Sequence, residues 1–146
     1  MDTANLEALF PRPGGPMSAA QRVLIVEDEA LVGMALEDAL GYLGIDVVGV
    51  AGTVDEALER IEADQFDGAI LDVQLHGKDV LPVAESLSQH GIPFVFATGY
   101  GRSGVPEKYR DSLVLQKPFM PAELKDVLTQ AGICQFPAGG QKSGPG

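Results

Sequence analysis

Residues that often carry chemistry are scarce in this chain of 146 residues, which has no tryptophan, one cysteine and two histidines. The single cysteine, Cys134, excludes an intramolecular disulfide and any cysteine-rich zinc site. His76 and His90 are too few and too far apart in the sequence to form a histidine cluster. No apolar segment approaches the roughly 20 residues that a membrane-spanning helix needs.

Basic residues are also scarce. Ten Lys and Arg residues stand against 21 Asp and Glu residues, which gives a formal net charge of −11, and the Lys and Arg residues do not cluster. This balance argues against direct binding to DNA or to an anionic membrane surface. Residues 1–16 lack the basic region and apolar stretch of a signal peptide. We therefore expect a cytoplasmic protein with a single hydrophobic core.

Both ends of the chain are rich in residues that interrupt regular structure. Residues 1–20 carry three prolines and two glycines between positions 11 and 16, and we expect them to form a disordered leader. Residues 133–146 are rich in glycine and proline, and we expect a flexible tail. The expected domain covers residues 21–132.

Between these ends, apolar runs typical of buried strands alternate with segments of helical periodicity. The expected strands are Arg22–Val26, Asp46–Ala51, Phe66–Leu71, Ile92–Ala97 and Leu113–Leu115. The expected helices are Ala30–Leu43, Thr53–Ala63, Val80–Gln89 and Pro121–Ala131, with a short one near Pro106–Arg110. This alternation predicts an α/β fold, a doubly wound five-stranded parallel sheet with helices on both faces. The common order for such a sheet is 2-1-3-4-5, the flavodoxin-like arrangement.

Polar side chains follow four of the five expected strands. Glu27 and Asp28 follow the first strand, Asp72 the third, Thr98 the fourth and Lys117 the fifth. Because parallel strands end at one edge of a sheet, we expect these side chains to meet in a crevice where the strand order reverses. Converging carboxylates repel one another, and their oxygen atoms favour Mg²⁺ or Mn²⁺ over zinc or copper.

Magnesium sites in proteins often include phosphate oxygens, so phosphoryl transfer is the chemistry that this crevice favours. The carboxylate of Asp72 can act as the nucleophile, since carboxylates accept phosphoryl groups. Lys117 and Thr98 offer a positive charge and a hydroxyl for the phosphoryl oxygens.

The same residues, in this order, carry a resemblance to a known family. The set Glu27-Asp28, Asp72, Thr98 and Lys117-Pro118 resembles the receiver domain of bacterial two-component response regulators, over Arg22 to about Gly132. The run Phe94-Val95-Phe96-Ala97-Thr98-Gly99-Tyr100 is similar to that of the FATGUY group of single-domain receivers, which is linked to HWE-type sensor kinases. The resemblance implies the same three-layer α/β/α fold and sheet order 2-1-3-4-5.

The resemblance also implies a metal-dependent phosphoacceptor. Asp72 would accept a phosphoryl group from a phosphohistidine on a sensor histidine kinase, such as one of the HWE type, or on a histidine phosphotransfer protein. Glu27 and Asp28 would hold Mg²⁺ together with Asp72 and the backbone carbonyl of Gln74, with Asp28 as the direct ligand.

The same likeness implies further roles for four residues and a class for the protein. Thr98 and Lys117 would bind the phosphoryl oxygens, and Gln74 and Tyr100, which flank the site, would modulate hydrolysis. Such a domain is a signalling phosphoacceptor that catalyses only its own phosphotransfer and dephosphorylation.

The chain departs from the usual receiver pattern at two positions. Val114 stands three residues before the lysine, where most receivers have the aromatic residue that turns inward on activation, and Tyr100 is the candidate replacement. His76 stands four residues after the acceptor, where most receivers have proline, and no role is assigned to it. The Gly-rich segment Gly99–Ser112 favours a weak fourth helix, and we expect phosphorylation to order this segment.

The expected output is a protein–protein contact, or removal of phosphoryl groups from a kinase as a phosphate sink, by a receiver with no output domain attached. The expected contact face combines the helix Met120–Ala131, the strand Leu113–Leu115 and the loop after Thr98, by analogy with the family. The downstream protein is unknown. The main alternative is a degenerate receiver that acts as a phosphorylation-independent docking module.

Two enzyme classes are weaker alternatives. Gly99–Gly104 matches G-x-G-x-x-G, but it follows the fourth strand, and Pro106 interrupts the long helix that a dinucleotide-binding site needs. A phosphatase with an aspartyl nucleophile usually has a second acid two residues after it, where this chain has Gln74.

Overall fold

The computed structural model describes residues 21–99 and 104–134. Five strands form one parallel sheet in the order β2-β1-β3-β6-β7. In chain order the strands are β1 (Arg22–Val26), β2 (Asp46–Ala51), β3 (Gly68–Asp72), β6 (Phe94–Thr98) and β7 (Val114–Gln116). The predicted order 2-1-3-4-5 is therefore confirmed, and the order reverses between β1 and β3.

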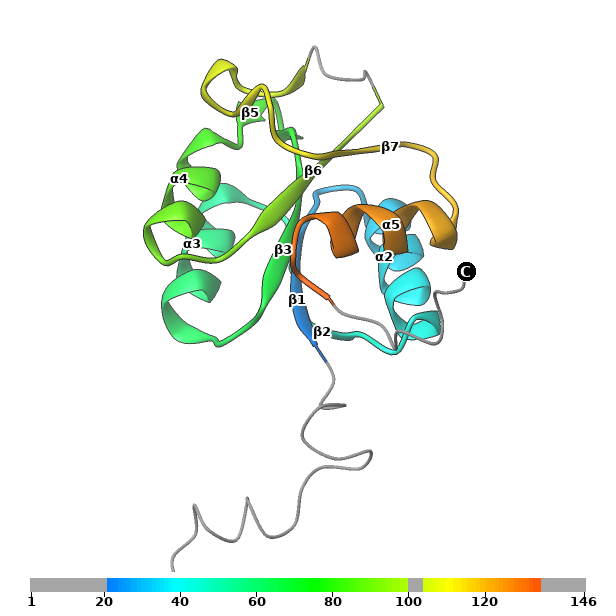
Figure 1. The fold of residues 1–146 in the computed structure, drawn as a ribbon. Coiled ribbons are helices and arrows are strands. Elements are labelled where there is room, and N and C mark those ends of the chain that lie inside the picture. The colour runs from blue at the N-terminus through cyan, green and yellow to red at the C-terminus, as the bar shows by residue number, and fades with distance from the viewer. Residues whose placement is uncertain (1–20, 100–103, 135–146) are drawn as a thin grey trace, which may run out of the picture.

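Helices cover both faces of this sheet. On one face lie α2 (Ala30–Tyr42) and α5 (Pro121–Gln130), and on the other lie α3 (Val54–Ala63) and α4 (Leu81–Gln89) (Figure 1). Successive residues of β1 alternate between the two faces: Val23 and Ile25 pack on the α2 and α5 side, and Leu24 and Val26 on the α3 and α4 side. The strands are apolar on both faces because both are buried.

The helix ends follow the local signals in the sequence. The Thr53 hydroxyl accepts a hydrogen bond from the Glu56 amide, 3.0 Å away, and so caps the start of α3, as the spacing predicts. Pro121 begins α5, where its missing amide hydrogen costs no helical hydrogen bond. Gly44 follows α2 with φ = 82°, a conformation that glycine adopts without strain.

Some expected boundaries are wrong. Phe66 and Asp67 precede β3, and the Asp67 carboxylate accepts a 2.7 Å hydrogen bond from the Arg22 amide at the start of β1. β6 and β7 each end one residue later than expected, at Thr98 and Gln116. Near 106–110 the only helical turn in the described residues is a 3₁₀ turn, η3 (Glu107–Tyr109), in agreement with the expected weak fourth helix.

Two further features differ from the expectation. A two-stranded hairpin, β4 (Gln74–Leu75) paired with β5 (Lys78–Asp79), follows β3 and was not predicted. Ile133 and Cys134, which we expected in a flexible tail, are 1% and 2% exposed and belong to the core beside α2 and α5. Burial raises the pKa of the Cys134 thiol to about 11.

The expected leader (1–20), the rest of the expected tail (135–146) and Tyr100 lie outside the described residues. Within the described ranges, no helix is long and apolar enough to cross a membrane.

Candidate metal and phosphoryl site

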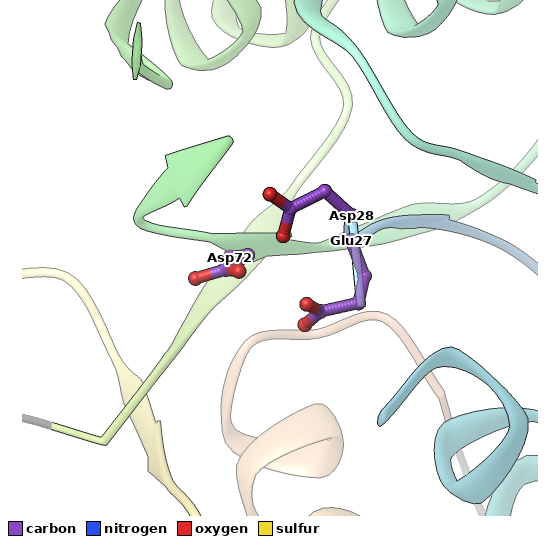
Figure 2. Close-up of side chains that lie close together, drawn as sticks. All are labelled: Glu27, Asp28 and Asp72. Carbon is purple, nitrogen blue, oxygen red and sulfur yellow. The ribbon is translucent and has the colours of Figure 1, made fainter. Parts of the chain in front are cut away.

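Three carboxylates meet where the strand order reverses. Glu27 and Asp28 follow β1, Asp72 ends β3, and these two strands are neighbours in the sheet. Each residue offers a carboxylate oxygen, and these oxygens lie within 4.8 Å of one another (Figure 2). The structure thus brings together the three acids that the strand-end pattern predicts.

Of the three acids, Glu27 is the most deeply buried and has the environment least favourable for a negative charge. Its side chain is 1% exposed, and burial raises the pKa of its carboxyl from 4.5 to about 7. The Glu29 amide and the Lys117 ammonium, each 3.1 Å from a Glu27 oxygen, oppose this rise, whereas the nearby charge of Asp72 adds to it. A buried carboxyl beside two other acids fits a site for a divalent cation, because a cation stabilises all three charges together.

Lys117 provides the positive charge in the crevice. Its ammonium nitrogen lies 3.1 Å from Glu27 Oε1 and 3.6 Å from Asp72 Oδ2. The Lys117 amide donates a 2.8 Å hydrogen bond to the Thr98 carbonyl, which joins the chain after β7 to the end of β6. The peptide bond between Lys117 and Pro118 is cis.

Thr98 completes the predicted set. It is the last residue of β6 and is 1% exposed. A cavity of about 410 Å³ opens at these strand ends and is lined by Asp28, Asp72, Thr98, Lys117 and the hairpin residues Gln74 and His76, among others. A phosphoryl group in this cavity would meet the carboxylate, the hydroxyl and the ammonium that phosphoryl transfer requires.

The hairpin β4–β5 contributes contacts that the sequence interpretation did not predict. The Gln74 amide lies 3.3 Å from Asp72 Oδ1, and the His76 amide donates a 2.7 Å hydrogen bond to Asp28 Oδ2. His76 and Gly77 form the turn with φ values of 50° and 78°, the positive values that two-residue hairpin turns need. The His-Gly pair is the one sequence signal that could have indicated this turn.

Tyr109 was also assigned no role from the sequence. Its ring lies 5.5 Å from that of Phe94 and 6.2 Å from that of Phe96, and its hydroxyl is 3.2 Å from Ser88 Oγ on α4. Val114, which occupies the usual place of an aromatic residue, packs against the same core cluster. An aromatic residue is therefore present on the α3 and α4 side of the sheet, and it comes from η3 rather than from β7.

A doubly wound sheet with an acidic crevice at its switch point defines an α/β protein suited to phosphoryl chemistry. The chain belongs to the response regulator receiver domain family, whose sequence pattern matches residues 23–129. Receiver domains are signalling modules that bind Mg²⁺ at an acidic pocket and receive phosphoryl groups from histidine kinases or phosphotransfer proteins. Family membership favours this interpretation over both the dinucleotide-binding and the phosphatase alternatives.

Two named proteins show the extent of the likeness. The chain is 34% identical to the phyllosphere-induced regulator PhyR of Methylorubrum extorquens over 139 residues, which cover 90% of this chain and 51% of that protein. The chain therefore spans about half the length of this curated relative. The solution structure of SdrG from Sphingomonas melonis Fr1 has a TM-score of 0.72 and 45% identity and covers 78% of this chain and 98% of SdrG. Its BeF3-activated conformation has a TM-score of 0.69 and 47% identity, covering 81% and 100% of the two chains.

Proposed function

We propose that the chain accepts a phosphoryl group on Asp72, in a Mg²⁺-dependent reaction, from a phosphohistidine of a sensor kinase or phosphotransfer protein. The observation that carries the proposal is the position of Asp72. Its carboxylate lies beside the acids Glu27 and Asp28 and 3.6 Å from the Lys117 ammonium, in a cavity that Thr98 also lines.

The donor set suits magnesium. Asp28, Asp72 and the backbone carbonyl of Gln74 would hold Mg²⁺, with Glu27 next to them, and Mn²⁺ suits the same oxygen ligands. A bound divalent cation would neutralise charge on the phosphoryl oxygens. Glu27 lies deeper than this donor set, since its side chain is 1% exposed, whereas those of Asp28 and Asp72 are 17% and 12% exposed.

The side chains of the site have separate roles in phosphoryl transfer. A carboxylate oxygen of Asp72 attacks phosphorus while the bond from phosphorus to the donor imidazole breaks. The Lys117 ammonium neutralises charge on one phosphoryl oxygen, and the Thr98 hydroxyl donates a hydrogen bond to another. Gln74 and Tyr100 are the proposed modulators of hydrolysis, and Tyr100 lies outside the described residues.

The proposed response to phosphorylation is an ordering of the segment between Thr98 and β7. The described part of this segment, residues 104–113, contains the short 3₁₀ turn η3 and no α-helix. Tyr109 connects it to the rest of the protein through Phe94, Phe96 and Ser88, and the buried Val105 belongs to the same core cluster. Because Thr98 is the last residue of β6 and the segment follows it, a shift of the Thr98 hydroxyl toward a phosphoryl oxygen would be transmitted to these contacts.

The output proposed for this receiver is a protein–protein contact through α5, β7 and the loop after Thr98, or the removal of phosphoryl groups from a kinase. An HWE-type kinase is the proposed donor because of the sequence of β6. The alternative is a docking module that is never phosphorylated, and the intact set Asp28, Asp72, Thr98 and Lys117 argues against it.

Labelling with acetyl phosphate, or with a cognate phospho-kinase, tests the proposal. We expect an acid-stable, base-labile phosphoryl group that forms with Mg²⁺, is lost with a chelator, and is absent from Asp72→Asn. The matched control is Glu59→Gln, which removes an exposed carboxylate on α3, away from the proposed contact face, and should label like the wild type. Equal labelling of Asp72→Asn and the wild type would refute the assignment of Asp72, and no label on the wild type would favour the docking module.

A further inference from the structure

The turn of the β4–β5 hairpin holds His76 against one of the three acids. The His76 amide donates a 2.7 Å hydrogen bond to Asp28 Oδ2, although 48 residues separate the two in sequence. His76 is the only non-glycine residue in the described ranges with a positive φ, 50°. A proline, the residue that most receivers carry here, has neither an amide hydrogen nor access to positive φ. This chain therefore makes a contact with Asp28 that the usual residue cannot make.

The imidazole ring of His76 also lies close to Asp28 Oδ2. Its Nδ1 atom is 3.6 Å from Asp28 Oδ2. A metal ion about 2.1 Å from a nitrogen and an oxygen can bridge any such pair less than about 4.2 Å apart, so one ion can contact both atoms. The side chain is 62% exposed and His76 lines the 410 Å³ cavity, so the ring has room to turn toward a bound ion.

A second histidine provides a comparison within the same molecule. His90 Nε2 lies 3.5 Å from Glu62 Oε2, a similar separation, and the other ring nitrogen lies 2.8 Å from the Ser86 carbonyl oxygen. Glu62 is not part of a group of three possible ligands, and among the described residues only Glu27, Asp28 and Asp72 form such a group. The His76 ring thus places a nitrogen beside one oxygen of this group, Asp28 Oδ2, whereas His90 faces a single exposed carboxylate.

Nitrogen in the donor set changes which cation is preferred. Carboxylate, carbonyl and water ligands suit Mg²⁺, whereas imidazole suits the later first-row divalent metals. Resting on the metal site of the proposed function, we propose that His76 is an additional ligand of this site and that it selects transition-metal ions such as Co²⁺, Ni²⁺ or Zn²⁺ relative to Mg²⁺. The hydrogen bond from the His76 amide to Asp28 keeps the ring within reach of the ion.

Metal titrations of the full chain test this proposal with Co²⁺ and Mg²⁺ as probes. His76→Gly removes the ring and keeps both the amide hydrogen and the positive φ, and His76→Asn is a second variant that tolerates this turn. We expect either variant to bind Co²⁺ at least about 10-fold more weakly and to lose the visible absorption change of nitrogen ligation, while the affinity for Mg²⁺ changes less than about 2-fold. His90→Ala should leave both affinities unchanged.

Three results would overturn the proposal: unchanged Co²⁺ binding in both His76 variants, an equal loss of Co²⁺ and Mg²⁺ affinity, or an equal loss of Co²⁺ affinity in His90→Ala. Failure of the proposed function gives a different result. If the wild type bound Co²⁺ through His76 but bound no Mg²⁺, the Mg²⁺-dependent function would be refuted and the role of His76 in metal selection would stand.

Discussion

The ammonium of Lys117 lies 3.1 Å from the carboxylate of Glu27, and the two residues are 90 positions apart in the sequence. The Glu27 side chain is 1% exposed and that of Lys117 is 19% exposed, so water screens this pair weakly. Lys117 Nζ also lies 3.6 Å from Asp72 Oδ2. In the metal-free protein the ammonium is therefore a counter-charge for two of the three acids that a divalent cation would neutralise.

Removing the ammonium should strengthen cation binding. In Lys117→Met the carboxylates keep their positions but lose a competing positive charge, so we expect Mg²⁺ to bind several-fold more tightly. The same variant should label on Asp72 far more slowly, because one phosphoryl oxygen loses its partner. Calorimetric titration measures the first effect and acetyl phosphate labelling the second. Weaker Mg²⁺ binding by Lys117→Met would show that Lys117 supports the cation site instead of competing with the ion.

Replacing Glu27 with glutamine should stabilise the metal-free protein. Burial raises the pKa of Glu27 from 4.5 to about 7, so between these values the carboxyl is ionised in the unfolded chain and protonated in the fold. Folding is therefore penalised progressively as pH rises through this range, and the penalty is constant above about 7. Glu27→Gln avoids the penalty, and we expect it to be more stable than the wild type by up to about 3 kcal/mol at neutral pH.

Urea unfolding of both proteins from pH 4 to pH 8, in the presence of a chelator, measures this difference. The advantage of Glu27→Gln should be smallest at the acid end, grow with pH and then level off. Saturating Mg²⁺ should stabilise the wild type more than the variant, because ligand binding stabilises the state that binds. An advantage that stayed constant across the pH range would contradict the link to ionisation of Glu27.

The fold and the acidic crevice were predictable because their signals are local. Strands such as Val23–Val26 are continuous apolar runs that end on charged residues, and strand order then decides which ends become neighbours. The hairpin β4–β5 was not predictable in this way, since strands of two residues carry no periodicity. The raised pKa of Glu27 depends on burial by residues distant in sequence, and no local pattern reports it.

The roles of Ile133 and Tyr109 were also not predicted from the sequence, because these roles depend on contacts between residues that are distant in sequence. Ile133 precedes a Gly- and Pro-rich stretch, yet its side chain fills the space beside Gly68, at the start of β3, where a Cβ atom would collide with it. Tyr109 is one of three tyrosines and stands in a polar segment. Its role becomes visible only when β6 presents Phe94 and Phe96 to it.

Gly104 should resist substitution because the chain returns close to the site there. A Cβ atom at this position would lie 2.9 Å from Val73 Cγ2 and 3.4 Å from Thr98 Oγ1. We expect Gly104→Ala to lower the free energy of unfolding by about 1–3 kcal/mol. The control is Gly41→Ala in α2, where a Cβ atom meets nothing within 4 Å and alanine should stabilise the helix by up to about 1 kcal/mol. Thermal unfolding of the two variants should give shifts of opposite sign, and equal shifts would contradict the close approach at Gly104.

Tyr109 should decide whether the segment that follows Thr98 becomes ordered on activation. In the wild type, beryllofluoride with Mg²⁺ should slow amide hydrogen exchange in residues 104–112, because an ordered segment exposes its amides less often. Tyr109→Leu removes the ring contacts with Phe94 and Phe96 and the hydroxyl contact with Ser88, so exchange should stay fast with and without beryllofluoride. Tyr42→Leu, at an 81% exposed tyrosine that ends α2, is the matched control and should behave like the wild type. Equal protection of the wild-type segment in both states would refute the ordering itself, whereas a wild-type response in Tyr109→Leu would leave the ordering intact and transfer the role of the anchor to another residue.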